Sequence, residues 1–145
     1  MNISLFCPVA WDIETEMEFS NMKQISDIIV FQRHEAAEQS FAAPEAVRIV
    51  GECRQSVVNH YSDPSGRFHC GMWSGGLGHW KVSYKEDEFC SLLKGRVRIY
   101  DEAGQSVELM PGEHFVIPAG FVGTWQVLEP ACKTYAVFEP PQWRE

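Results

Sequence analysis

The sequence has little positive charge and no long apolar run. Its 145 residues include 12 Lys and Arg against 20 Asp and Glu, and the formal net charge of -8 repels nucleic acid phosphates and anionic lipid headgroups. No apolar run has the length that spans a bilayer, and the first residues lack the basic and apolar regions of a signal peptide. We therefore expect a cytoplasmic protein that binds neither nucleic acid nor membranes.

Paired cysteines are also absent. The cysteines are odd in number and widely spaced, and no CxxC pair suggests a zinc knuckle or a redox dithiol. Free cysteine is among the most buried residue types, so we expect reduced thiols that act as small apolar core residues. The five are Cys7, Cys53, Cys70, Cys90 and Cys132.

Short runs rich in β-branched and aromatic residues dominate the chain from about residue 46 onward. Gly- and Pro-containing turns separate these runs, and no long helical period interrupts them. With 45% hydrophobic residues the chain can close one core, so we predict a single all-β domain. The predicted strands are 46–50, 56–61, 67–73, 79–84, 88–93, 96–100, 106–110, 114–117, 122–128 and 133–138.

The first 43 residues are less regular. Residues 11–19 alternate apolar and mostly acidic side chains, which predicts a strand with an acidic outer face that discourages edge pairing. We predict a further strand at 25–31 and a short helix at 33–41. The expected organisation is an N-terminal extension over 1–43, with one or two added strands, and a main domain over 44–145.

Two spaced motifs resemble the conserved motifs of the cupin superfamily. They are Glu88-x6-Gly95 and Gly112-x5-Pro118-x-Gly120. In metal-binding cupins the first motif contains HxHxxxxE and the second contains PxGxxH, and the three histidines and the glutamate bind a divalent metal. The resemblance implies a double-stranded β-helix, which is a jelly-roll barrel, usually paired as a homodimer.

One branch of the superfamily is especially similar. Over about residues 44–139, with E-x-C-x-x-L-x-G and PxGxxGxW as signatures, the chain resembles the ureidoglycine aminohydrolase-like cupin group of unknown function. That group also includes the ethanolamine-utilisation cupin. Ureidoglycine aminohydrolase activity depends on a histidine-bound manganese, and those histidines are absent here, so the resemblance does not extend to that reaction.

The alignment leaves Glu88 as the one remaining metal ligand. It puts Lys81 and Ser83 at the two histidine positions of the first motif and Gly123 at the third. A protonated lysine, a serine hydroxyl and a glycine are poor ligands or none, so Glu88 alone would hold a divalent ion weakly. We predict that no metal and no cofactor bind at this position.

Strand alternation converts the alignment into a predicted site. Side chains two residues apart share a face, so we expect Glu88, Cys90 and Leu92 to point into the barrel. We expect Lys81 and Ser83 to line it from the preceding strand. One hypothesis makes Glu88 a proton carrier and Lys81 the group that fixes the substrate's charge. The alternative is an ion pair that holds two strands in register. The candidate ligand-binding residues are Ser83, Cys90, Trp125, Tyr84 and Tyr135.

The histidines allow a competing site. His69, His79 and His114 stand alone in the sequence, but they could meet in space and form a displaced metal site. The preferred hypothesis is a small-molecule binding protein, or a metal-independent enzyme, for a small carboxylate or amine metabolite. The alternatives are a metal-dependent cupin enzyme and a non-catalytic accessory protein whose sheet face docks a partner. Neither the ligand nor an enzymatic role can be read from the sequence.

Overall fold

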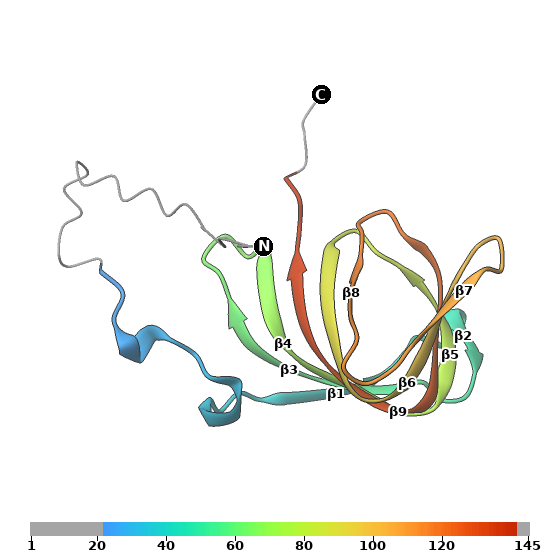
Figure 1. Cartoon of the computed structure of the whole chain (residues 1–145), viewed down its shortest axis with the longest axis horizontal. Coiled ribbons are helices and arrows are strands. Elements are labelled where there is room, and N and C mark those ends of the chain that lie inside the picture. The colour runs from blue at the N-terminus through green and yellow to red at the C-terminus, as the bar shows by residue number, and fades with distance from the viewer. Residues whose placement is uncertain (1–21, 142–145) are drawn as a thin grey trace, which may run out of the picture.

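The computed structural model describes residues 22–141, so the strand predicted at 11–19 lies outside the described part (Figure 1). Every strand pairing in this part is antiparallel, which confirms the all-β prediction. No helix in residues 22–141 is long and apolar enough to cross a membrane. The strands are β1 Glu38–Ala42, β2 Arg48–Val50, β3 Arg54–Ser62, β4 Phe68–Gly75, β5 Gly78–Ser83, β6 Asp87–Asp101, β7 Ser106–Leu109, β8 His114–Ile117 and β9 Val122–Phe138.

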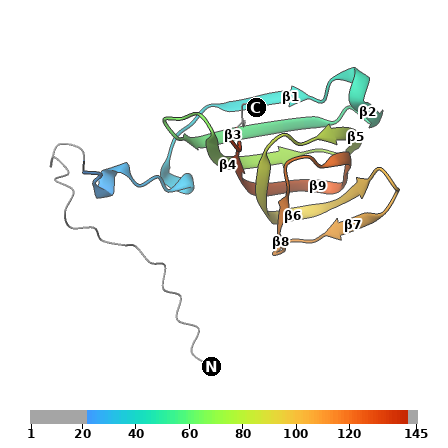
Figure 2. The same ribbon diagram turned by 90° about the horizontal axis from the view of Figure 1, so that it is seen from above.

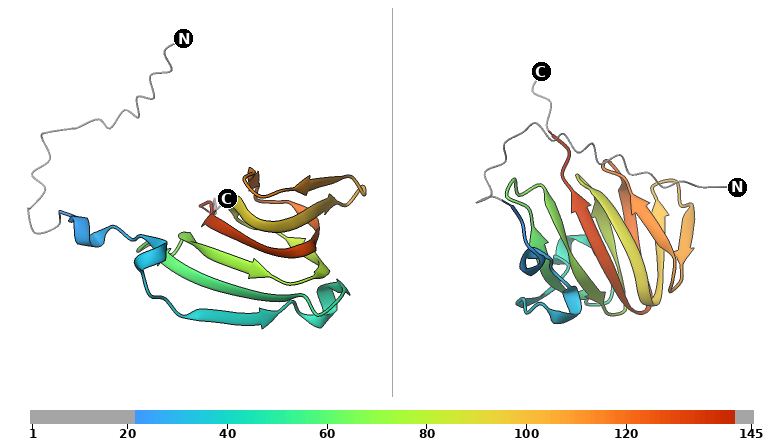
Figure 3. Two further views of the ribbon diagram at one scale, coloured as in Figure 1. Left: turned by 60° about the horizontal axis from the view of Figure 1, so that its bottom comes forward. Right: turned by 60° about the vertical axis from the view of Figure 1, so that its left-hand side comes forward.

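The two longest strands, β6 and β9, organise the sheet. They pair with each other along nearly their whole length. The first part of β9 also pairs with β5 and its last part with β4, while the first part of β6 pairs with β8 and its last part with β7. The sheet therefore folds over itself into two facing halves, β1-β3-β4-β9-β6-β8 and β2-β5-β9-β6-β7 (Figures 2 and 3). This is the predicted jelly-roll barrel.

Four predicted strands merge into two continuous ones. Residues 88–93 and 96–100 both belong to β6, and residues 122–128 and 133–138 both belong to β9. The register between β6 and β9 shifts several times between Leu92 and Val97 of β6. At this bend the chain passes from one half of the barrel to the other without leaving the sheet.

The predictions for residues 25–31 and 33–41 are wrong. The first segment contains the single-turn 3-10 helix η2 Ile25–Asp27, and a second one, η3 Phe31–Arg33, joins the two segments. Residues 22–37 form an arm that projects from the barrel (Figure 2). The second segment ends in β1, which pairs with β3. The hydrogen bonds between β1 and β3 hold residues 38–42 in a strand. These bonds outweigh the weak local preference for a helix. A third such turn, η4 Glu45–Val47, precedes β2.

Alternating side chains from both halves fill the interior. Trp73 and Trp125 meet edge to face with 5.7 Å between ring centroids. Glu88, Cys90 and Leu92 are all buried, as expected for alternate residues of one strand face. The buried apolar residues between the two halves include Trp73, Trp80, Leu92, Val97, Ile99, Leu109, Ile117, Trp125, Val127 and Tyr135.

Candidate functional site

A buried ion pair lies inside the barrel. Glu88 of β6 is 8% exposed and Lys133 of β9 is 4% exposed, and the Lys133 Nζ donates a hydrogen bond to Glu88 Oε1 over 3.1 Å. The strand register sets this contact, because Lys133 lies opposite Leu92 and Val137 lies opposite Glu88. The motif glutamate thus has a lysine partner.

Two indole rings complete the surroundings of the Lys133 ammonium. Its Nζ lies 5.0 Å from the ring centroid of Trp73 and 4.5 Å from that of Trp125. The same Nζ lies 3.5 Å from the Cys90 sulfur. Aromatic faces attract a cation through their quadrupole, and the attraction increases when water is excluded. A carboxylate, a thiol and two aromatic faces therefore enclose the charge.

Two further ionisable groups next to Glu88 remain protonated near neutral pH. Burial raises the pKa of the Cys90 thiol to about 12, although the nearby Lys133 ammonium opposes this shift. Burial also raises the pKa of the Tyr84 phenol, and the Glu88 and Cys90 charges add to that increase. Both groups can donate hydrogen bonds, but neither is a ready nucleophile at pH 7.

Tyr135 and Trp125 also face this region. The Tyr135 hydroxyl donates to Asn59 Oδ1 over 2.9 Å, and burial raises its pKa to about 12. The Trp125 indole is 2% exposed, and its Nε1 has no hydrogen-bond partner among the described residues. The structure therefore gathers Glu88, Cys90 and these aromatic residues in one interior region. Their role in ligand binding stays a prediction.

The predicted orientation of Lys81 and Ser83 is wrong. Both side chains are exposed, and the buried or half-buried members of β5 are Trp80 and Val82. The alignment placed the strand one residue out of phase, which moves every side chain to the opposite face. Lys81 therefore does not share the interior with Glu88, and its predicted catalytic role loses its structural basis.

The residues at the former ligand positions do not fit a metal. A side chain at Gly123 would collide with the carbonyl oxygen of Tyr100. If three residues instead of four separate the second histidine position from Glu88, the two histidine positions fall on Val82 and Tyr84. Both of these side chains pack against the core. Valine has no donor atom, and the Tyr84 phenol is held in its protonated form by its raised pKa. These residues leave Glu88 without a second good ligand.

The three histidines of the competing hypothesis have separate surroundings. His69 is hydrogen-bonded through Nδ1 to Ser62 Oγ at 2.6 Å, and His79 through Nε2 to Thr124 Oγ1 at 2.7 Å. His114 lies on β8. No group of three His, Cys, Asp or Glu residues in positions 22–141 is placed to hold a metal ion.

Lys133 was missed, although the sequence carries a signal for it. The sequence predicts a strand over 133–138 and makes Tyr135 a candidate ligand-binding residue of the barrel. Alternation within that strand puts Lys133 on the same face as Tyr135. The alternation that groups Glu88 with Cys90 therefore marks Lys133 as an interior residue, but the partner of Lys133 depends on the register between β6 and β9.

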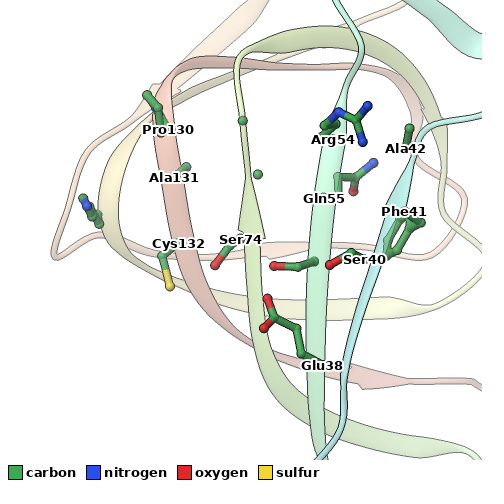
Figure 4. Close-up of a pocket in the computed structure, with 14 residues that line it drawn as sticks. Glu38, Ser40, Phe41, Ala42, Arg54, Gln55, Ser74, Pro130, Ala131 and Cys132 are labelled. Carbon is green, nitrogen blue, oxygen red and sulfur yellow. The ribbon is translucent and has the colours of Figure 1, made fainter.

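A separate cavity of about 590 Å³ opens on the outer face of the larger half-sheet (Figure 4). Its floor is a row of four small polar side chains on β1, β3, β4 and β9. The register aligns Ser40 with Ser56, Ser56 with Ser74, and Ser74 with Cys132. None of these four takes part in the side-chain hydrogen bonds found within residues 22–141. We call this cavity the serine trough.

Charged residues line the serine trough as well. Glu38 and Arg54 come from β1 and β3, and Lys94 comes from the bend of β6. Arg54 is paired through Nε with Glu52, and its side chain is 75% exposed. Phe41 adds an aromatic edge that is 46% exposed. Unused hydroxyl groups, the Lys94 ammonium and the N–H groups of Arg54 other than Nε are thus available to a ligand.

A family comparison identifies the central part of the chain. The family model described as the EutQ-like cupin domain matches residues 62–135. No curated protein matches the chain.

Solved structures show the same fold. The Clostridium difficile EutQ protein has a TM-score of 0.60 at 22% identity, with 84% of this chain and 94% of that chain covered. A Pseudomonas syringae pv. tomato protein of unknown function from the DUF861 family has a TM-score of 0.63 at 22% identity. That match covers 70% of this chain and 44% of the other, so this chain spans less than half of that protein. A putative ethanolamine utilization protein Q from Salmonella typhimurium has a TM-score of 0.55 at 12% identity, covering 74% and 98%.

Proposed function

The chain belongs to the family of EutQ-like cupin domains, and from this premise we propose that it is a non-catalytic protein that binds a small carboxylate metabolite in the serine trough. The observation that carries the proposal is the aligned row of Ser40, Ser56 and Ser74 beside two cationic side chains.

The barrel interior is less suited to binding a ligand than the serine trough is. Glu88 and Lys133 already neutralise each other, and both are at most 8% exposed. The neighbouring Cys90 thiol, with a pKa of about 12, is a poor nucleophile. A catalytic site needs groups that are accessible and poised to change protonation state near pH 7. The interior cluster supports stability better than it supports turnover.

The chemistry of the trough favours an anionic ligand. Neighbouring strands lie about 4.8 Å apart, so several of the aligned serine side chains can reach one small molecule. Lys94 supplies positive charge, and Arg54, which is paired with Glu52 through Nε, adds its remaining N–H donors. Hydrogen bonds to a charged partner are the strong ones. Glu38 can accept from a hydroxyl or amino group on the same ligand. Small hydroxy acids and amino acids have this combination of groups.

Calorimetry and thermal-shift measurements test the proposal with lactate, succinate and glycine as carboxylate probes. Ethanolamine serves as the amine probe, because the Salmonella typhimurium neighbour is a putative ethanolamine utilization protein. We expect at least one carboxylate to bind saturably and to raise the melting temperature, with no conversion seen by NMR. Lys94→Met should weaken binding about tenfold or more, because it removes a charge-assisted hydrogen bond.

Lys85→Met is the matched control, because Lys85 is exposed and lies outside the trough. It should leave the affinity unchanged. If the wild type converts a probe and Glu88→Gln does not, the barrel contains a catalytic site instead. Binding that is insensitive to Lys94→Met would place the ligand elsewhere.

A further inference from the structure

We propose that the barrel contains a site built for a primary ammonium ion, and that Lys133 fills this site from within the chain. The ammonium takes the place at the motif glutamate that a divalent metal has in metal-binding cupins. This inference concerns the interior cluster and is independent of the serine trough.

The contacts of Lys133 show why an ammonium suits this site. Its Nζ has a carboxylate oxygen at 3.1 Å and a thiol sulfur at 3.5 Å, both within donor reach. The indoles of Trp73 and Trp125 present their faces at 5.0 and 4.5 Å. Two aromatic faces and one anionic acceptor are the means by which proteins recognise alkylammonium groups. Each of these contacts acts on a compact cation with N–H donors.

The same contacts exclude a divalent metal. Indole faces supply no lone pair for coordination, and a thiol with a pKa of about 12 does not ligate as a thiolate without losing its proton. Gly123 leaves no room for an imidazole, because a side chain there would collide with the Tyr100 carbonyl. One carboxylate alone binds a divalent ion weakly. An interior that lacks the motif histidines and holds Lys133 therefore suits an ammonium ion and not a divalent metal.

Lys133→Ala tests the inference by emptying the site. The atoms removed beyond Cβ correspond to n-propylammonium, so that ion is the probe. We expect the variant to melt about 10 °C or more below the wild type, because Glu88 loses its partner in a buried setting. Added n-propylammonium should restore part of the loss in a saturable manner. The neutral 1-propanol and the bulkier tetramethylammonium ion should not.

The controls separate charge from packing. Lys133→Met keeps the length of the side chain without its charge, so it should also melt below the wild type. Lys85→Ala removes an exposed lysine and should neither lower the melting temperature nor respond to n-propylammonium. If Lys133→Met is as stable as the wild type, the ammonium charge is dispensable and the inference is wrong.

A titration of Lys133→Ala with divalent metals tests the opposite hypothesis, that the interior is a metal site. Manganese, nickel or zinc that stabilises Lys133→Ala more than n-propylammonium does would show a metal site that the lysine blocks, and would overturn the proposal. If Lys133→Ala does not fold, Glu88→Gln, Lys133→Met and the double variant replace it. The double variant should then melt above both single variants, because neither charge is left unpaired. A double variant that melts below both would contradict an interaction between the two groups.

Discussion

Gly95 shows how one residue permits the bend in β6. Its backbone φ is +84°, a region that L side chains rarely adopt. A Cβ at this position would lie 2.6 Å from the Cα of Ala131 and would also collide with the carbonyl oxygen of Pro130. Both neighbours are backbone atoms of β9, so they cannot rotate away. The Glu-x6-Gly spacing therefore has a structural cause, since it ends where the backbone of β9 leaves no room for a Cβ.

We predict that Gly95→Ala lowers the free energy of unfolding by more than about 3 kcal/mol, because strained backbone and a backbone collision add together. Gly104→Ala is the matched control. Gly104 has a similar φ of +83° but open space around it, so its substitution should cost about 1 kcal/mol. Urea unfolding measures both values. Equal losses for the two variants would show that the close approach to β9 contributes nothing.

At the scale of elements, the contact between the arm and the barrel centres on His60. The register of β3 with β4 shifts between Asn59 and Tyr61, and this bulge coincides with the burial of the His60 ring. Phe31 of the arm stacks on that ring at 4.5 Å, and His34 Nδ1 lies 3.0 Å from His60 Nδ1. A hydrogen bond between two imidazoles requires that one nitrogen accepts, so the contact fails when both rings are protonated.

This contact predicts that the arm loosens in acid. Burial, and second the charge of His34, lower the pKa of His60 from its ordinary 6.5. A lowered folded-state pKa means that the stabilisation is complete above about pH 6.5 and is lost as the pH falls through the folded-state value. The other ionisable groups on the adjoining elements are Lys23, Asp27, Arg33 and Glu35 of the arm, Arg54 and Tyr61 of β3, and His69 and Cys70 of β4.

Hydrogen exchange of residues 31–37 at about pH 7.5 and about pH 5, corrected for intrinsic rates, measures this loosening. Protection should fall at the lower pH in the wild type. His60→Phe removes the group whose pKa is lowered and keeps an aromatic ring for Phe31, so it should remove the pH dependence. His69→Gln, a histidine substitution away from this contact, should retain it. A wild-type arm equally protected at both values would contradict the prediction.

At the scale of the whole molecule, an apolar area remains exposed on the outer surface of β6 and β8. Phe89 is 47% exposed and lies opposite Val116, which is 61% exposed, while Leu93 on the same strand is 51% exposed. Neighbouring large apolar side chains on a surface are typical of protein interfaces. The homodimer expected from the resemblance to cupins stays a prediction, and this area is where we place its interface.

Light scattering after size exclusion should give twice the mass of one chain. Phe89→Asp should shift the particle towards the monomer, because it puts a charge at the centre of the interface. Leu77→Asp changes another exposed leucine away from this area and should leave the dimer intact. A monomeric wild-type protein would rule out the homodimer at the concentration tested.

Much of the fold could be predicted because local chemistry determines it. The alternation of apolar and polar residues within each run is a property of neighbouring residues, and so is the placement of Gly and Pro at turns. The burial of Glu88, Cys90 and Leu92 on one face followed from that alternation. The arm was predicted less well, since its short segments contain no repeating pattern and β1 exists because β3 lies beside it.

The partner of Glu88 shows what only the tertiary structure decided. The sequence by itself determined the all-β class, the turns and the motif glutamate, because these depend on residues close together in the chain. It could not place Lys133, 45 residues away, against Glu88, nor turn Lys81 outward. Those two outcomes depend on the register between strands, and a shift of one residue exchanges the two faces of a strand. Register is set by the packing of the whole sheet, so the ion pair at the centre of this barrel appears only once β4, β6 and β9 lie side by side.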